Sequence, residues 1–194
     1  MDDEVWLIVG LGNPGPSYAE TRHNLGYRVA DLLAERMTGS WRSHKNRQVD
    51  VVEGRLGGQP GTRVVLARAR AYMNETGGPI SSLMRFYKIP TERLVAIHDE
   101  LDLPFGALRV KFGGGDNGHN GLRSLRLSLG TGEFHRVRLG IGRPPGRRDP
   151  ADFVLSNFTV VERADVPMAV DQAADAVETL LTVGLSITQS RFNS

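Results

Sequence analysis

The alternation of short apolar runs with helical patterns constrains the fold of this chain more than any other feature. Runs of strand length, most of them bounded by glycine, proline or charged residues, lie at 5–9, 49–52, 64–67, 94–97, 108–112 and 137–141. Apolar residues at helical spacing lie between or after these runs: Leu25, Val29, Leu32 and Leu33; Ile80, Leu83, Met84 and Tyr87; Leu122, Leu125 and Leu129; and Met168, Ala173, Val177, Leu180 and Leu181.

This order of elements predicts an α/β sandwich with a mixed sheet. Strands that alternate with helices are typical of that class, and segment 53–63 is too short for the helical crossover that a parallel pair needs. Pro79 is expected at the first position of the second helix, where its missing N–H is tolerated.

Length and composition indicate one domain in the cytosol. Single domains run to about 100–200 residues, so we expect residues 1–194 to form one domain. No apolar run approaches the ~20 residues of a membrane span, and the acidic start Met-Asp-Asp-Glu is unlike a signal peptide. The chain has no cysteine, which excludes disulfides, a thiolate nucleophile and a zinc site built on sulfur.

The positive charges are concentrated in the middle of the chain. Residues 105–148 carry nine Lys or Arg against two Asp or Glu, whereas residues 149–194 carry two against seven. Of the 24 cations, 21 are arginine, whose planar fork suits phosphate. A nucleic-acid partner and a solvated basic surface both explain this block.

The segment Gly-Leu-Gly-Asn-Pro-Gly at 10–15 matches the spacing of a dinucleotide-binding loop. In such a site the glycines lead directly into a helix, and an acid about 20 positions on binds the ribose. Here prolines delay the helix to about Thr21, and the acids at that distance, Asp31 and Glu35, fall inside the first helical pattern. We therefore interpret the segment as a tight turn after a strand, which either presents Asn13 or is a turn only.

His23 is predicted in or just before the first turn of a helix. The positive end of the helix dipole disfavours an imidazolium ion, which would keep His23 neutral and able to accept a proton. The alternative is a structural histidine.

The segment His-Asp-Glu-Leu-Asp at 98–102 follows a strand, at the sheet edge where ligands collect. Three interpretations remain open. Asp99 could orient His23, as the acid does in hydrolytic triads. The carboxylates of Asp99, Glu100 and Asp102 could hold a divalent metal, as in two-metal nucleases. The third is a solvated acidic loop.

Two further loops are expected at the same edge. The glycine-rich segment 113–121 would place His119 and Asn120 at the start of a helix whose N–H groups can bind an anion. Segment 71–78 would bring Tyr72, Met73 and Asn74 beside them, where core packing of Tyr72 and Met73 is the alternative.

The motifs that are missing restrict the chemistry. The chain has no G-x-S-x-G elbow, no H-E-x-x-H and no P-loop, so water is the expected nucleophile.

Together these segments resemble bacterial peptidyl-tRNA hydrolases. The shared motifs are Gly-Leu-Gly-Asn-Pro-Gly (10–15), Thr-Arg-His-Asn (21–24), Tyr-Met-Asn (72–74), His-Asp-Glu-Leu-Asp (98–102) and Gly-His-Asn-Gly (118–121), with further agreement at 137–142 and 153–155. The resemblance implies a monomeric single-domain α/β globule with a mixed twisted sheet between helices. It also implies that the chain hydrolyses the ester joining an N-blocked peptide to tRNA, with no metal or cofactor.

The resemblance assigns roles to residues that match the family motifs. His23 resembles the general base, Asp99 the residue that orients it, and Asn13 the residue that senses the blocked amino group. Amide donors from Asn74 and Asn120 are expected to stabilise the oxyanion. The remaining matches are to contacts with the tRNA 3′ end and peptide (Tyr18, Tyr72, Asn74 and Asn120), the lining of the cleft (Met73) and a basic cluster that clamps tRNA phosphate (Lys111, with Arg109 and Arg138).

One position departs from the family pattern. Asn117 stands where glycine is expected, so it needs a left-handed conformation or a different loop path. Two competing functions follow from the same residues: a metal-dependent nuclease built on the carboxylates at 99–102, and an RNA-binding adaptor without catalysis.

Overall fold

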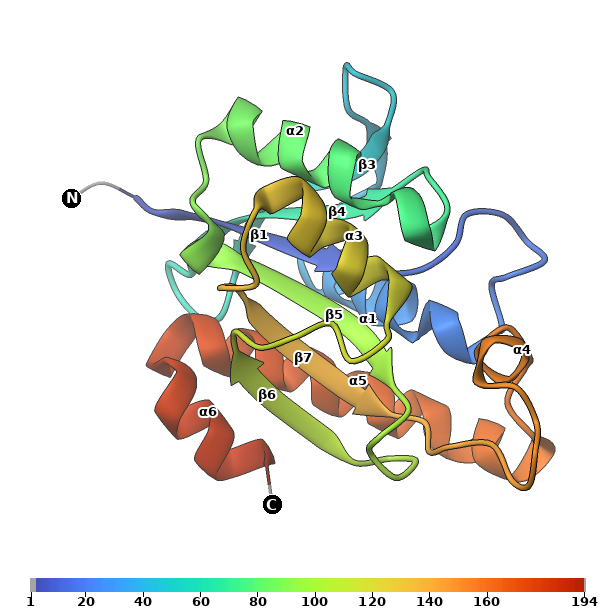
Figure 1. Cartoon of the computed structure of the whole chain (residues 1–194). Coiled ribbons are helices and arrows are strands. Elements are labelled where there is room, and N and C mark those ends of the chain that lie inside the picture. The colour runs from blue at the N-terminus through green and yellow to red at the C-terminus, as the bar shows by residue number, and fades with distance from the viewer. Residues whose placement is uncertain (1–2, 194) are drawn as a thin grey trace.

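The computed structural model describes residues 3–193 and contains one seven-stranded mixed sheet between two layers of helices (Figure 1). The strand order is β2-β3-β4-β1-β5-β7-β6. The strands are β1 (Val5–Gly10), β2 (Arg42–Ser43), β3 (Val49–Leu56), β4 (Thr62–Ala69), β5 (Leu94–Glu100), β6 (Leu108–Phe112) and β7 (His135–Gly140). The central strands β4, β1, β5 and β7 run parallel, and β2, β3 and β6 are antiparallel to their neighbours. The predicted fold class is confirmed, including the antiparallel turn between β3 and β4.

Helices cover both faces of this sheet (Figure 1). On one face lie α1 (Leu25–Arg36) and α5 (Val160–Val183), and on the other lie α2 (Gly77–Tyr87) and α3 (Asn120–Leu129). The last helix, α6 (Leu185–Phe192), packs beside the edge strand β6, and the short helix α4 (Pro150–Val154) precedes α5. Within residues 3–193 the helices include none with the length and apolarity to span a membrane.

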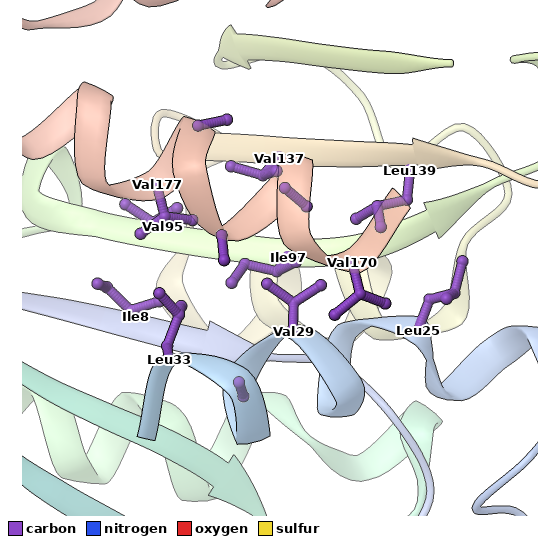
Figure 2. Close-up of a cluster of buried hydrophobic side chains, with 14 of the residues drawn as sticks. Ile8, Leu25, Val29, Leu33, Val95, Ile97, Val137, Leu139, Val170 and Val177 are labelled. Carbon is purple, nitrogen blue, oxygen red and sulfur yellow. The ribbon is translucent and has the colours of Figure 1, made fainter. Parts of the chain in front are cut away.

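The period-two alternation of β5 divides its apolar side chains between the two cores. Val95 and Ile97 point to the α1–α5 face, whereas Leu94 and Ala96 point to the α2–α3 face. Figure 2 shows Val95 and Ile97 meeting residues of β1, β7, α1 and α5: Ile8, Val137, Leu139, Leu25, Val29, Leu33, Val170 and Val177. Burying each such Val, Leu or Ile contributes about 1.5–3 kcal/mol.

Two helix expectations are wrong in detail. Pro79 is the third residue of α2 and not the first, because α2 begins at Gly77, whose N–H donates to Ser124 Oγ at 2.8 Å. Met168 lies off the apolar face of α5 and is 65% exposed. The buried stripe of that helix runs through Val166, Val170, Ala173, Val177 and Leu180.

The parallel strands bring three of the predicted segments, 10–24, 71–78 and 98–102, to one edge, whereas segment 113–121 follows the antiparallel β6 and reaches that edge near its end, where His119 contacts Asp99. β1, β4, β5 and β7 end there, so the segments that follow them in the chain gather at their carboxyl ends. The 3₁₀ helices η1 (Arg22–Asn24) and η2 (Met73–Glu75) both lie in these segments. Among the described elements that the sequence did not predict are the short β2, α4 and α6, and the 3₁₀ helix η3 (Thr91–Arg93).

Candidate active site

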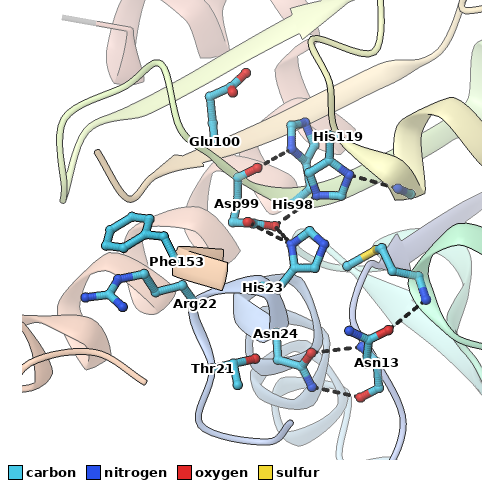
Figure 3. A network of polar contacts seen from close by, with 12 residues as sticks. Asn13, Thr21, Arg22, His23, Asn24, His98, Asp99, Glu100, His119 and Phe153 are labelled. Carbon is cyan, nitrogen blue, oxygen red and sulfur yellow. Dashed lines mark hydrogen bonds and ion pairs between the residues drawn. The ribbon is translucent and has the colours of Figure 1, made fainter. Parts of the chain in front are cut away.

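Asp99 lies between two histidines at the end of β5 (Figure 3). Its carboxylate oxygens are 2.9 and 3.0 Å from His23 Nδ1, and Oδ1 is also 2.9 Å from His119 Nε2. His23 comes from η1, and His119 is the N-cap of α3. All three residues are buried, with exposures of 2% for Asp99, 6% for His23 and 9% for His119. The structure thus brings together the predicted pair of His23 and Asp99 and adds His119.

The hydrogen bonds of His119 fix its tautomer. Its Nδ1 accepts the backbone N–H groups of Gly121 at 3.0 Å and Leu122 at 3.3 Å, so Nε2 carries the proton that is donated to Asp99. From the sequence, these N–H groups of the α3 N-terminus are expected to bind an anion. That expectation is wrong for Gly121 and Leu122, because the His119 imidazole already occupies both donors.

His23 and Asp99 shift each other's titration. Burial lowers the pKa of His23, but the charge of Asp99 and its hydrogen bond raise it by more, so the net pKa lies above the ordinary histidine value. Burial raises the pKa of Asp99, yet His23 and His119 lower it further, and the net pKa is far below the usual range. The expected effect of the helix N-terminus on His23 is therefore outweighed by Asp99.

His98 has a structural role beside this group. It is completely buried, and its Nδ1 donates to the Asp99 carbonyl at 2.7 Å. Burial, together with the neighbouring His119, holds the pKa of His98 well below its usual range, so the ring stays neutral. Its ring meets that of His119 edge-on, with centroids 4.9 Å apart.

A pocket of about 230 Å³ opens in front of His23. Its polar lining comes from the ends of β5 and the loop before α3, and its apolar lining from α4 and Leu101. The lining residues are His23, Asp99, Glu100, Leu101, Asn117, Gly118, His119, Asn120, Pro150, Ala151 and Val154. His23 Nδ1 is hydrogen-bonded to Asp99, so Nε2 is the ring nitrogen left to accept a proton.

Asn13 is held in place by hydrogen bonds to two neighbours, Asn24 and Met73. Asn24 Oδ1 accepts the Asn13 backbone N–H at 2.8 Å, and Asn24 Nδ2 donates to the Asn13 carbonyl at 2.9 Å. The Asn13 side-chain oxygen accepts the Met73 backbone N–H at 2.7 Å. Because that oxygen is used, Asn13 presents its Nδ2 amino group as a donor.

Of the other predicted contact residues, Asn120 lines the pocket, while Tyr18, Tyr72 and Asn74 lie in the segments that follow β1 and β4. Tyr18 and Tyr72 approach each other with ring centroids 6.1 Å apart, and Tyr72 is 54% exposed. Asn74 is exposed on η2, and Asn120 is the exposed first residue of α3 and lines the pocket. Met73 is 3% exposed and packs in the α2–α3 core, so it meets Asn13 through its backbone.

The predicted phosphate-binding residues share one face of the antiparallel strand pair β6–β7. Arg109 lies opposite Arg138 in the strand register, and Lys111 lies opposite Arg136. Arg138 is paired with Glu100 at 2.8 Å, and Arg109 donates to the Asn193 carbonyl. Burial lowers the pKa of Lys111, and the nearby charges of Arg138 and Arg136 lower it further. Of the three predicted residues, Lys111 has no ion pair in the described chain.

Asn117 adopts the left-handed conformation, with φ of 52°. Its side-chain amide donates to both Glu100 oxygens at 3.1 and 3.2 Å and to Asp102 at 2.5 Å. Asp102 also pairs with Arg143 at 2.5 Å. Glu100 and Asp102 are therefore bound by cations and an amide, and do not join Asp99 in one cluster of carboxylates.

The atoms that could hold a metal belong to a different set. Within the described residues, His23, Asp99 and His119 are the group whose ligand atoms all lie within 4.8 Å of one another. The same atoms are used in the hydrogen bonds described above. A metal here would have to displace the protons of His23 Nδ1 and His119 Nε2.

Comparison with known proteins places the chain in a family. The family model of peptidyl-tRNA hydrolase matches residues 7–194. This chain belongs to the peptidyl-tRNA hydrolase family. It is 58% identical to the peptidyl-tRNA hydrolase of Mycolicibacterium smegmatis over 187 residues, which covers 96% of each protein. It is 55% identical to that of Frankia alni, with 100% of this chain and 96% of the relative covered.

A solved member of the family has the same fold. The crystal structure of peptidyl-tRNA hydrolase from Acinetobacter baumannii superposes with a TM-score of 0.90 at 33% sequence identity, covering 99% of this chain and 96% of that one. The resemblance seen in the sequence is thus confirmed at the level of family and fold.

Three buried residues of the site were not among the predicted site residues. His119 binds Asp99, Asn24 holds Asn13, and Arg22 connects η1 to the chain before α5. The signal for all three was present, because Arg22 and Asn24 flank His23 in the motif at 21–24 and His119 belongs to the motif at 118–121. The contacts of Arg22 are with residues far away in the sequence, and they form only in the packed fold.

Proposed function

We propose that this protein hydrolyses the ester bond of N-blocked peptidyl-tRNA and releases free tRNA and peptide, with His23 as general base. The family membership supports the substrate, and the contact between Asp99 and His23 Nδ1 supports the mechanism. The proposal includes a single-domain monomer in the cytosol, where stalled translation would supply the substrate. No cofactor takes part in the proposed reaction.

The proposed reaction begins with a water molecule bound to His23 Nε2. The water oxygen attacks the ester carbonyl carbon while Nε2 accepts a proton, and Asp99 stabilises the imidazolium that forms. The tetrahedral intermediate then loses the ribose 3′ oxygen, which takes the proton back from His23. Amide donors from Asn74 and Asn120 would stabilise the oxyanion, and each such donor is typically worth about 3–4 kcal/mol.

Asn13 is proposed to distinguish blocked from unblocked substrates. An N-acylated residue carries a carbonyl oxygen that can accept a hydrogen bond from Asn13 Nδ2. A free α-ammonium group offers only donors, and it would leave the buried Nδ2 group without an acceptor. The contact that fixes the Asn13 oxygen on the Met73 N–H supports this role, because it prevents the amide from turning to suit an ammonium group.

The tRNA is proposed to bind across the pocket. Tyr18, Tyr72, Asn74 and Asn120 would contact its 3′ end and the peptide. Lys111 would contact a phosphate, with Arg109 and Arg138 contributing positive potential from the same face of the β6–β7 strand pair.

One assay separates this proposal from its rivals. Release of N-acetyl amino acid from N-acetyl-aminoacyl-tRNA is measured in EDTA, with the wild type, with His23→Ala and with unblocked aminoacyl-tRNA as control. The proposal requires hydrolysis of the blocked substrate by the wild type, loss in the variant and intact tRNA. If the tRNA is fragmented without EDTA and stays intact with it, the protein is the nuclease. Binding of tRNA without hydrolysis would establish the adaptor.

A further inference from the structure

Arg22, the residue before His23, is a buried charge that connects η1 to a distant part of the chain. It is 3% exposed, and its guanidinium donates to Ser156 Oγ at 2.6 Å, to the Asn157 carbonyl at 2.9 Å and to Glu162 Oε1 at 2.8 Å. Its backbone N–H also donates to the Ser156 carbonyl at 3.0 Å. These bonds pair the two terminal nitrogens of the guanidinium, while its buried Nε has no hydrogen-bond partner among the described residues, and they join segment 156–162 to η1.

The same guanidinium supports the apolar wall of the pocket. Its central carbon lies 4.0 Å from the centroid of the Phe153 ring, and Phe153 is a 5% exposed residue of α4. Pro150, Ala151 and Val154 of the same short helix line the pocket. A helix of five residues is not stable by itself, so its position depends on such tertiary contacts.

Figure 3 shows Arg22 and His23 leaving the same turn on different sides, Arg22 toward Phe153 and His23 toward Asp99. We infer that Arg22 is a positioning residue of the hydrolytic site, which holds the His23 main chain and the α4 wall of the substrate pocket in one fixed geometry. This inference rests on the proposed function, because the geometry that it fixes is that of the water-activating histidine and the pocket before it.

Loss of Arg22 is expected to shift the pKa of His23 in a defined direction. The charged and titratable groups facing His23 are Asp99 from β5 and His119 from the start of α3, with Glu100 in the pocket lining; α4 lines the pocket with uncharged residues. If η1 shifts, the contact between His23 and Asp99 weakens while His23 remains buried. The pKa of His23 should then fall, because Asp99 is what raises it.

The test compares Arg22→Lys and Arg22→Gln with a matched control, Arg36→Gln. Arg36 also joins α1 to α5, through Asp171, Asp175 and Glu178, and it contacts none of the residues that line the pocket. For each folded variant, kcat and KM are measured with N-acetyl-aminoacyl-tRNA, and the ring protons of His23 are titrated by NMR without substrate. Circular dichroism gives the thermal unfolding midpoint.

The inference predicts that Arg22→Gln lowers kcat by roughly tenfold or more, raises KM and moves the His23 titration to lower pH. Arg22→Lys should retain part of the activity, since lysine keeps the charge but lacks the planar guanidinium with its several donors. Arg36→Gln should lower the thermal unfolding midpoint and leave kcat, KM and the His23 titration unchanged. If Arg22→Gln does not fold, the Lys variant decides: a folded Lys variant with wild-type KM and His23 titration would overturn the inference. The titration needs no substrate, so a wild type without hydrolysis would refute the proposed function separately.

Discussion

Asp99 accepts a hydrogen bond from His23 Nδ1 with one oxygen at 2.9 Å, and its other oxygen lies 2.9 Å from His119 Nε2. The carboxylate is thus fixed from both sides, so it cannot turn away from His23 when the imidazole changes its protonation. This arrangement directs the proton-accepting His23 Nε2 away from Asp99.

Removing the base should abolish turnover. His23→Ala is expected to lower kcat by at least about 10²-fold, because a positioned general base contributes about 10²- to 10⁴-fold. His44→Ala is the control: its imidazole is equally buried, but it packs against Phe86 and lines no part of the pocket. Release of N-acetyl amino acid under single-turnover conditions measures the effect, and a His23→Ala rate close to that of the control would contradict the mechanism.

The pH dependence should follow the raised pKa of His23. The base acts when deprotonated, so kcat should fall as the pH drops through that pKa, with half-maximal rate above pH 6.5. In Asp99→Asn the charge that raises the pKa is absent and burial remains, so the half-maximal point should move below pH 6.5 with a lower maximum. An exposed control, Asp175→Asn, should leave the profile unchanged.

The same group should affect stability with the opposite pH trend. Because the folded pKa of His23 is raised, its contribution to the free energy of unfolding is fully present below pH 6.5 and is lost as the pH rises through the folded pKa. Urea unfolding of the wild type and of His23→Ala across this range should show that only the wild type has this dependence. Parallel curves for the two proteins would contradict the shift.

Substrate discrimination should depend on the Asn13 amino group. Asn13→Asp keeps the shape and the oxygen that accepts the Met73 N–H, but it replaces the Nδ2 donor with an acceptor. We expect slower hydrolysis of N-acetyl-aminoacyl-tRNA and relatively faster hydrolysis of the unblocked form. Asn46→Asp, at an exposed turn, is the control. An unchanged ratio of the two rates in Asn13→Asp would exclude the proposed role.

Lys111 should contribute to tRNA affinity and not to chemistry. Lys111→Ala is expected to raise KM with kcat largely unchanged, and to reduce the slope of log KM against log salt by about 1. Lys45→Ala is the control, since this ammonium group lies over Phe86 outside the pocket. An identical salt slope in Lys111→Ala and wild type would show that no phosphate is bound there.

Asn117 combines a strained backbone with side-chain hydrogen bonds, and two substitutions separate them. Asn117→Gly and Asn117→Ala both lose the amide that binds Glu100 and Asp102. Only alanine is destabilised by the left-handed backbone conformation, by about 1–2 kcal/mol. Chemical denaturation should therefore show that alanine is the less stable variant by about that amount. Equal stabilities would mean that the loop takes another path when the side chain is changed.

The sequence by itself determined the class of fold, the order of its main elements and the edge at which the site lies. Local spacing is sufficient for this, because a continuous apolar run such as 94–97 indicates a strand buried on both faces, whereas a helical stripe such as that of α1 indicates burial on one face. The motifs also identified His23, Asp99 and Asn13, and the structure places His23 and Asp99 in contact and Asn13 nearby.

Only the tertiary structure decided which polar groups pair. His119 meets Asp99 across 20 residues, Arg22 meets Glu162 across 140, and Arg138 binds Glu100 instead of standing free for phosphate. No local pattern encodes these choices, because each depends on how separate elements pack and on the requirement that every buried charge find a partner. The same requirement assigns the two N–H groups at the start of α3 to His119, where the sequence suggested an anion.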